Sequence, residues 1–481
     1  MERRLEGMGL FLSRWMLALC LAVLGAGLLL GGIQAADNRR ALVLAVLALP
    51  PAAKLLPALL ARAETAAAWK VWLLLTLLCL GVKGVWVALV QVPPQGDYAT
   101  FWGYARALAE QPVLEDGRYM ALFPHIFGYA SFLSWFIALF GPAPMLAPVL
   151  NVALTLCSGS LLFLLGRRVR GTAGGAAAYL LWILCPSQTM YNSLVLSEPL
   201  YTTLLLLFWL AVTGPAPARC APAVLLGAGA GMILRWFNGV RPIGAVPLIA
   251  LLLWRFCLAP DGLRERDGRR RRLVLLSALL AAYLASGPLW QGRVAARLGE
   301  EPAVTPGYSV LVGFNTRSMG RWNQADSDLL FSCSGQPGAT AQQAQEAALD
   351  AAAARIAGLR PGGFARLFME KLRGFLGSDN SCVVYSQAVV RHTGRFSLAC
   401  NGFYYLLLLL ALWGGVELWR RGERTPVLQA PLYVLGLTLA QMLVEVAGRY
   451  HYSLIPALIL AALPALFRVN GKWGEKNEKI P

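Results

Sequence analysis

Apolar runs long enough to cross a lipid bilayer recur throughout this sequence of 481 residues, from Leu10 to Phe467. A helix needs about 20 apolar residues to span a hydrocarbon core about 30 Å thick. Hydrophobic residues make up 57% of the chain and charged residues only 14%, whereas roughly a quarter of an average soluble protein is charged. The sequence therefore predicts an all-α polytopic membrane protein.

The first apolar run is too long for a signal-peptide core and has no small-residue cleavage site after it, so we expect it to remain as a helix. The length and hydropathy of the runs predict about 12 crossings. The predicted spans are Leu10–Ile33, Ala41–Leu60, Ala68–Val92, Leu146–Leu165, Gly174–Met190, Leu196–Val212, Val224–Phe237, Ile243–Cys257, Leu273–Leu289, Gly402–Trp419, Leu428–Val446 and Tyr452–Leu466.

Basic residues give the chain a formal net charge of +18 and lie in short clusters between the apolar runs. This placement is typical of cytoplasmic loops. It argues against a nucleic-acid partner, because nucleic-acid-binding proteins gather basic residues on one face or arm. We therefore expect both termini in the cytoplasm. The clusters are Arg3-Arg4, Arg167-Arg168-Val169-Arg170, Arg269-Arg270-Arg271-Arg272, Arg420-Arg421 and Lys472 to Lys479.

The apolar stretch Phe123–Phe140 decides the topology. If it crossed the bilayer, the basic loops at Arg167–Arg170 and Arg264–Arg272 would face outward, against the positive-inside rule. We therefore expect this stretch to lie along the outer surface, or to dip in and return. All strong basic clusters are then cytoplasmic, and Arg39-Arg40 is one mild exception.

This topology divides the chain into three parts. Residues 1–290 form an N-terminal transmembrane region with a catalytic external loop at 93–145, and residues 291–400 form an extracytoplasmic subdomain. Residues 401–481 contain the last spans and a basic cytoplasmic tail. Two amphipathic helices are expected within the subdomain, at Ala341–Ala357 and Gly363–Phe375.

Asp97 is the candidate catalytic residue. It follows a predicted span and precedes a helical pattern at Phe101–Leu108 whose apolar face suits a membrane interface. A carboxylate at that position can take a proton from an acceptor hydroxyl. An aspartate before a helix is also a common cap, which by position alone is the better explanation.

External basic side chains suit the binding of an anionic group, because arginine contacts phosphate through two hydrogen bonds. A single arginine at a helix end more commonly extends its side chain so that the charge lies at the membrane–water interface. Glu198 before Pro199 suits a helix start. Glu445 lies four residues before Arg449, where a continuing helix would pair them. The candidate binding residues are Arg118, His125, Glu198, Arg241, Arg449, Tyr450 and His451.

The cysteines and histidines do not suggest a metal site, since their spacing matches no ligand motif. Cys333, Cys382 and Cys400 belong to one long polar segment, and if that segment lies outside the cytosol, one pair could form a disulfide. The connectivity stays open, and a third cysteine is left over. We expect no metal or cofactor.

The order of several short motifs resembles the GT-C glycosyltransferases, and among them the family 39 group, related to protein O-mannosyltransferases and the aminoarabinose transferase of lipid A. The resemblance extends over nearly the whole chain. It departs from the family in the first external loop, where many members have paired acids and this chain has Asp97-Tyr98. The matching pieces are Asp97-Tyr98, Phe123-Pro124-His125, Phe140-Gly141, Asn151, Arg167-Arg168, Ser197-Glu198-Pro199, Arg241-Pro242, Gly313–Asp326 and Arg449-Tyr450.

The resemblance implies a GT-C-like bundle with extracytoplasmic surface helices and a small external subdomain. It implies a polyprenyl-phosphate sugar as donor and a glycan, lipid or protein as acceptor. Asp97 would be the base and the anomeric carbon would be inverted. Asn315, Trp322 and Asp326 would contact the acceptor or an adjacent loop. The expected location is the bacterial plasma membrane, with an extracytoplasmic active site.

Two other functions suit a polytopic chain. A transporter or flippase of lipid-linked sugars would need charged residues along a central path and internal symmetry. The predicted mid-membrane positions are mostly apolar and no internal repeat is evident. A structural or assembly protein would tolerate replacement of the external acids and arginines.

Overall fold

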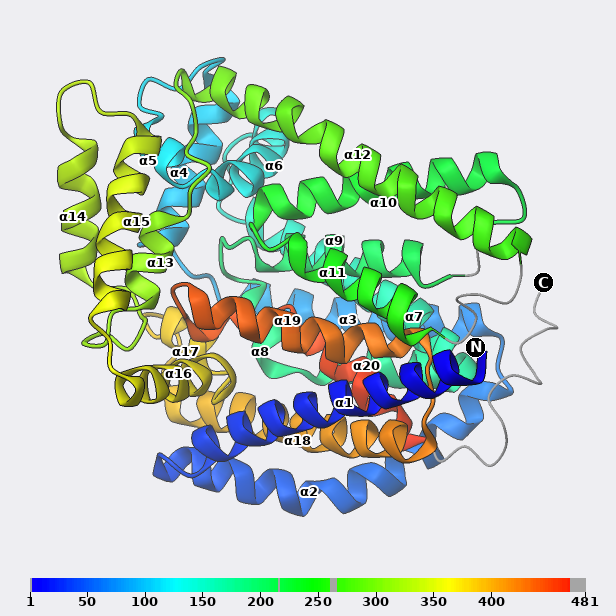
Figure 1. Cartoon of the computed structure of the whole chain (residues 1–481). Helices are drawn as coiled ribbons and strands as arrows, with labels where there is room; N and C mark the ends of the chain where they lie inside the picture. The colour runs from blue at the N-terminus through cyan, green and yellow to red at the C-terminus, as the bar shows by residue number, and fades with distance from the viewer. Residues whose placement is uncertain (1, 215–216, 260–265, 468–481) are drawn as a thin grey trace.

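The computed structural model describes residues 2–214, 217–259 and 266–467, and within these ranges it contains helices and no strands (Figure 1). The chain is an all-α membrane protein. Eight helices of the described ranges are long and apolar enough to cross a bilayer, and further apolar helices have 10–17 residues. The predicted basic cluster at Lys472 to Lys479 lies wholly outside the described residues. The basic loop Arg264–Arg272 lies partly outside them, because the description resumes at residue 266.

The predicted spans lie largely within the following helices. These are α1 (Glu2–Gly32), α2 (Ala36–Ala61), α3 (Ala68–Leu89), α7 (Leu146–Leu184), α9 (Glu198–Val212), α10 (Cys220–Val240), α11 (Ala245–Leu253) with the π-helical turn η2 (Trp254–Leu258), α12 (Arg266–Leu298), α18 (Thr393–Arg421), α19 (Gln429–Leu443) and α20 (Leu454–Leu466).

Shorter helices connect or cover them. These are η1 (Arg62–Glu64), α4 (Asp97–Glu110), α5 (Arg118–Leu122), α6 (His125–Phe140), α8 (Pro186–Tyr191), α13 (Gly307–Gly313), α14 (Gln324–Ser334), α15 (Ala341–Ala357), α16 (Pro361–Leu376), α17 (Ser381–Ser386), η3 (Pro426–Leu428) and η4 (Gly448–His451).

The long helix α7 consists of two arms joined by a sharp turn. Gly171 has a φ of 55°, a conformation that glycine adopts without strain. A side chain at Gly159 would meet the Tyr179 ring of the other arm, and one at Gly166 would meet the backbone of Gly174. Small residues let helices approach closely in membranes. The arms agree with the two separate spans predicted from the sequence.

Helix α10 is longer than the span predicted at 224–237 and packs closely against α12. Gly227 and Gly231 lie one turn apart and face the backbone of Leu275 and Leu279 in α12. Glycines at this spacing are typical of tightly packed membrane helices. The α10–α12 pair therefore forms a rigid support for Arg241, the residue that follows α10.

Helix α6 begins and ends at the same end of the bundle. Gly128, near its start, packs against Gly239 at the end of α10. After α6 the chain enters α7, in which the Asn151 side chain donates to the Leu194 carbonyl, just before α9 begins. Figure 1 shows α4, α5 and α6 gathered at one end of the molecule with α13–α17. Whether α6 lies along the membrane surface or dips in and returns stays a prediction.

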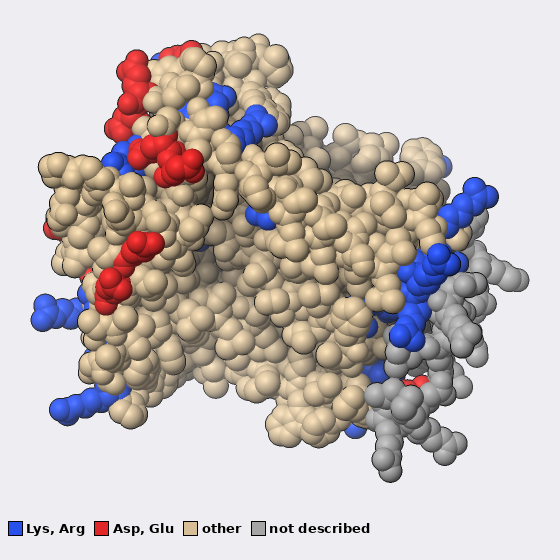
Figure 2. Space-filling view, turned by 45° about the horizontal axis from the view of Figure 1, so that its top comes forward, with Lys and Arg blue, Asp and Glu red and all other residues tan. Residues whose placement is uncertain are grey.

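The two ends of the bundle differ in charge. Figure 2 shows acidic side chains gathered at one end of the visible face and a group of basic side chains at the other. Arg168, in the basic turn of α7, donates to the Leu210 carbonyl and the Thr213 hydroxyl, each at 2.7 Å, at the C-terminal end of α9. Glu198 begins α9, about 22 Å away for a 15-residue helix. The Arg-rich turn and Glu198 therefore lie at opposite ends.

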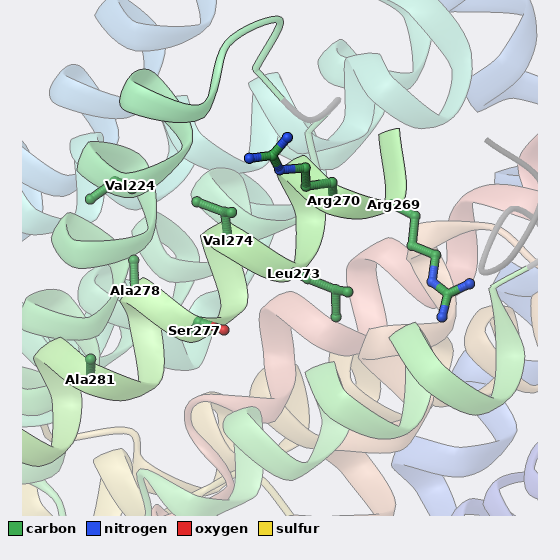
Figure 3. Close-up of a pocket in the computed structure, with 8 residues that line it drawn as sticks. All are labelled: Val224, Arg269, Arg270, Leu273, Val274, Ser277, Ala278 and Ala281. Atoms are coloured by element: carbon green, nitrogen blue, oxygen red, sulfur yellow. The ribbon is translucent and has the colours of Figure 1, made fainter. Parts of the chain in front are cut away.

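A cavity of about 680 Å³ lies at the basic end, between the start of α10 and the start of α12. Figure 3 shows Arg269 and Arg270 beside apolar side chains that include Leu273 and Val274. Arg241 lies beyond the opposite end of α10. This cavity is therefore separate from the predicted catalytic end.

Candidate functional site

Arg449 is the centre of a charged cluster at the end of the bundle where α9 begins. It lies in η4, the short turn between α19 and α20. Its Nη2 is 2.6 Å from Oδ2 of Asp97, the first residue of α4, and its Nε is 3.9 Å from Oε1 of Glu198. The Glu198 side chain is only 2% exposed, whereas that of Asp97 is 56% exposed. One guanidinium therefore links three segments that are distant in sequence.

Two tyrosines surround this guanidinium. The Arg449 Cζ lies 5.7 Å from the ring centroid of Tyr385 and 5.6 Å from that of Tyr450. Cations over aromatic faces are attracted by the ring quadrupole. Burial lowers the pKa of Arg449, but the phenols of Tyr385 and Tyr450 together with the Glu198 and Asp97 carboxylates raise it well above its ordinary value. The side chain therefore stays charged.

Arg241 provides a second guanidinium beside Arg449. Its Cζ lies 3.9 Å from the ring centroid of Tyr450. Within the part of the chain that the structure describes, its guanidinium forms no hydrogen bond or ion pair. A cation that is stacked but not ion-paired can bind an incoming anion through its N–H groups.

Glu445 adds a further carboxylate, but not in the predicted way. Helix α19 ends at Leu443 and Val444 is extended, so Glu445 and Arg449 do not share a helix face, and the predicted ion pair is absent from the described residues. The Tyr450 hydroxyl lies 3.5 Å from Glu445 Oε1. Burial raises the pKa of Glu445, although Arg449 and Arg241 oppose the shift.

His125 begins α6 and faces the same cluster as a neutral group. Burial lowers its pKa to about 3, with further contributions from the nearby guanidinium groups of Arg241 and Arg449. An imidazole with this pKa is uncharged at physiological pH. The ring is therefore a hydrogen-bonding group and not the cation that its place among the predicted phosphate ligands suggested.

Two other predicted binding residues have structural partners outside the cluster. Arg118 pairs with Glu300 at 3.2 Å and donates to the Ala339 carbonyl at 2.8 Å. His451 is buried: its Nδ1 lies 2.7 Å from the Phe375 carbonyl oxygen and its Nε2 lies 3.1 Å from Asp379 Oδ1. Of the neighbours Arg449, Tyr450 and His451, only the first two face the cluster, while His451 anchors the turn.

The predicted acceptor contacts also have local roles. Asp326 accepts from Arg355 at 2.8 Å and from the Asn315 side chain at 2.9 Å. Burial opposes ionisation of Asp326, but the hydrogen bonds from Arg355, Asn323 and Asn315 lower its pKa. This network connects α14 to α15. Trp322 lies on the surface and is 59% exposed.

Cys382 and Cys400 are brought together, with a Sγ–Sγ distance of 3.9 Å. Both are buried free thiols. The Met190 sulfur lies 3.8 Å from Cys382 and 3.9 Å from Cys400. Cys333 is a free thiol that is partly exposed. Of the three cysteines considered for a disulfide, Cys333 is thus the one without a neighbouring thiol among the described residues.

Lys371 binds the backbone next to Glu445 and so stabilises the cluster, a role that the sequence did not indicate. Its ammonium donates to the carbonyls of Gly313, Met442 and Val444 at 2.9, 2.7 and 2.8 Å. Burial lowers the pKa of Lys371 to about 7, while the three carbonyls match the three N–H donors of the charged form. Lys371 therefore joins α16 and the end of α13 to the segment that carries Glu445.

We expect Lys371→Met to lower the free energy of unfolding by at least about 3 kcal/mol, because three carbonyls lose a donor and each unsatisfied group costs about 1–3 kcal/mol. Thermal unfolding of the detergent-solubilised protein measures this change. Arg366→Met is the matched control, since it removes an exposed cation from the same helix. Equal unfolding temperatures for the two variants would contradict the assigned role.

Comparisons with known proteins find a distant structural likeness. No family model matches the sequence, and no curated protein matches it. The crystal structure of ArnT from Cupriavidus metallidurans bound to undecaprenyl phosphate is 14% identical, with a TM-score of 0.32, over 84% of this chain and 79% of that chain. The same protein in its apo state is 15% identical, with a TM-score of 0.30, over 84% and 78% of the two chains. The chain is thus similar to ArnT only in the broad arrangement of its helices.

Proposed function

We propose that this protein is a membrane glycosyltransferase that transfers a sugar from a polyprenyl-phosphate donor to an extracytoplasmic acceptor, with inversion and with Asp97 as general base. One observation carries the proposal: Asp97, Glu198, Arg241 and Arg449 come from four separate segments and meet at one end of the bundle. Ionisable side chains that cluster in one place are typical of functional sites.

The position of Asp97 supports its role as general base. Arg449 holds one carboxylate oxygen at 2.6 Å, and the other oxygen has no hydrogen-bond partner among the described residues. The side chain is more than half exposed at the start of a rigid helix. It can therefore reach a substrate hydroxyl while its direction is set by the ion pair.

Arg241 and Arg449 suit the leaving phosphate. Their guanidinium groups lie on Tyr450 and stay charged, so they can stabilise the negative charge that develops as the bond from the anomeric carbon to phosphate breaks. The acceptor oxygen attacks from the opposite face, which inverts the carbon. The polyprenyl tail remains in the lipid between the spans.

The charge distribution supports an extracytoplasmic site. The basic turn of α7 and the Arg-rich start of α12 lie opposite the Asp97 cluster, and such basic segments stay in the cytoplasm. The cluster then faces outward and both termini face the cytoplasm.

The direct test is transfer by the purified protein in proteoliposomes. We expect one member of a panel of radiolabelled polyprenyl-phosphate sugars to be consumed, with polyprenyl phosphate released and the label passed to an acceptor in added envelope extract. A flippase would move the lipid-linked sugar across the bilayer and leave its sugar–phosphate bond intact. That outcome, or no turnover of any donor, would overturn the proposal.

We expect Glu445→Gln to lower the donor KM about threefold at a pH above the raised pKa of Glu445, because an ionised carboxylate repels the donor phosphate. The fold favours protonated Glu445, so the cost of ionising this side chain is present at high pH and is relieved as the pH falls. The wild-type KM should therefore rise with pH more steeply than that of the variant. Steady-state kinetics across pH measure both, with exposed Glu346→Gln as control. An increased KM in Glu445→Gln would contradict the repulsion.

A further inference from the structure

A groove of about 530 Å³ leads away from the Asp97 cluster along α4. It begins at Ala99 and Thr100, two and three residues after Asp97, and continues to the loop that precedes α5. Gly103 and Ala107 form part of its lining. These small side chains recur at helical spacing on one side of α4, so the helix itself leaves room for a ligand.

One wall of the groove is aromatic. The rings of Tyr104 and Tyr119 are stacked with centroids 6.3 Å apart and planes at 11°. Tyr119 is stacked in turn on Phe331 of α14, at 6.1 Å and 13°. The carboxylates of Asp97 and Glu445 are close enough to raise the pKa of the Tyr119 phenol, after the larger effect of burial. Tyr104 and Tyr119 both line the groove, which begins two residues after Asp97.

The far end of the groove is acidic and firmly held. Glu115 and Asp116 line it, and none of the described lining residues is Lys or Arg. Arg297 of α12 donates to the Leu108 and Gln111 carbonyls at 2.6 and 2.9 Å. The loop that carries the two acids is thus anchored on the end of α12.

This lining selects one class of ligand. The Tyr104 ring, which lines the groove, offers apolar carbon to the C–H groups of a sugar ring, and carboxylates accept hydrogen bonds from hydroxyl groups. A phosphate or carboxylate would be repelled by Glu115 and Asp116, since like charges in contact cost several kcal/mol. A lipid chain would need a continuous apolar wall, which the two acids interrupt.

We propose that this groove is the acceptor site and that the acceptor enters it with a carbohydrate ring that has no anionic group. The inference rests on the proposed glycosyltransferase function and names its acceptor class. The acceptor hydroxyl gives its proton to Asp97, and its oxygen bonds to the anomeric carbon. The bond from that carbon to the phosphate oxygen breaks, and polyprenyl phosphate leaves with the electron pair.

The first test introduces a bulky side chain into the groove. Gly103 has open space where a side chain would begin, so Gly103→Trp is compatible with the backbone of α4 and blocks the groove. We expect at least about a tenfold loss of labelled acceptor product, with binding of polyprenyl phosphate, measured by native mass spectrometry, retained. Gly362→Trp is the matched control, because Gly362 is an exposed helical glycine of the external subdomain that also has open space.

A second variant distinguishes a loss of acceptor binding from a folding defect. Tyr104→Leu removes one ring of the aromatic wall without adding bulk, and we expect it to raise the KM for the acceptor about tenfold with less effect on kcat. Donor consumption by the wild-type protein tests the glycosyltransferase function separately. If the wild type consumes the donor and both variants transfer sugar normally, the groove is not the acceptor site.

Product analysis tests the acceptor class. The labelled sugar is expected on a hydroxyl of a sugar ring without phosphate or carboxylate, and Glu115→Gln with Asp116→Asn is expected to increase transfer to 6-phosphorylated octyl glucoside relative to octyl glucoside. Label on a phosphorylated sugar, a lipid or a peptide would overturn the assignment.

Discussion

Asp97→Asn is expected to lower sugar transfer by at least about 100-fold, because general-base catalysis contributes about 10²- to 10⁴-fold and an amide cannot take the proton. The amide keeps the size of the carboxylate and stays beside Arg449 Nη2, which is 2.6 Å from Oδ2 in the wild type. The side chain is more than half exposed, so the protein should insert and accumulate normally. Transfer measured in membranes, normalised to protein amount, gives the result.

Asp350→Asn is the control for this prediction. Asp350 is an exposed acid of α15, and its replacement should leave transfer unchanged. Donor binding separates the roles of Asp97 further, since loss of a base lowers kcat more than it weakens binding. Retained transfer in Asp97→Asn would remove Asp97 from the catalytic role.

Arg449→Met is expected to have the second large effect, on both stability and activity. It leaves the Glu198 carboxylate, which is 2% exposed, without its ion-pair partner. Removal of one member of a buried ion pair costs about 3–5 kcal/mol. It also removes a cation from the expected phosphate site. We therefore expect a lower unfolding temperature in detergent and a loss of transfer.

A second substitution separates these two consequences. Adding Glu198→Gln to Arg449→Met removes the unpaired charge, so we expect it to recover most of the stability. It does not restore a guanidinium beside Tyr385 and Tyr450, so transfer should remain lost. A double variant that regains activity would show that Arg449 acts only through the fold.

Much of the helical architecture was predictable because membrane insertion leaves a strong pattern in the sequence. The two spans of the α7 hairpin were separated by the basic cluster at Arg167–Arg170, and the structure places the turn at Arg170 and Gly171. Helix α15 has the predicted bounds, Ala341–Ala357, and begins with a capping box between Thr340 and Gln343. These features depend on local hydropathy, charge and capping.

The candidate site was predictable only in part. Asp97, Glu198, Arg241, Arg449 and Tyr450 were selected by their expected place at external helix ends, and they lie together. Residues with the same sequence properties have other partners. Arg118 pairs with Glu300, and Asp326 binds Arg355. Hydropathy predicts how deep in the membrane a side chain lies, but not which residue it contacts.

The sequence by itself determined the membrane class, most helix positions and the expected topology, because each follows from the cost of placing polar and charged groups in lipid. Only the tertiary structure decided which charges meet. It placed Arg449 between Asp97 and Glu198, left His125 neutral, turned His451 inward to Asp379, and brought Lys371 to three carbonyls. Such pairings depend on packing between segments that are distant in the chain, and that packing leaves no local pattern in the sequence.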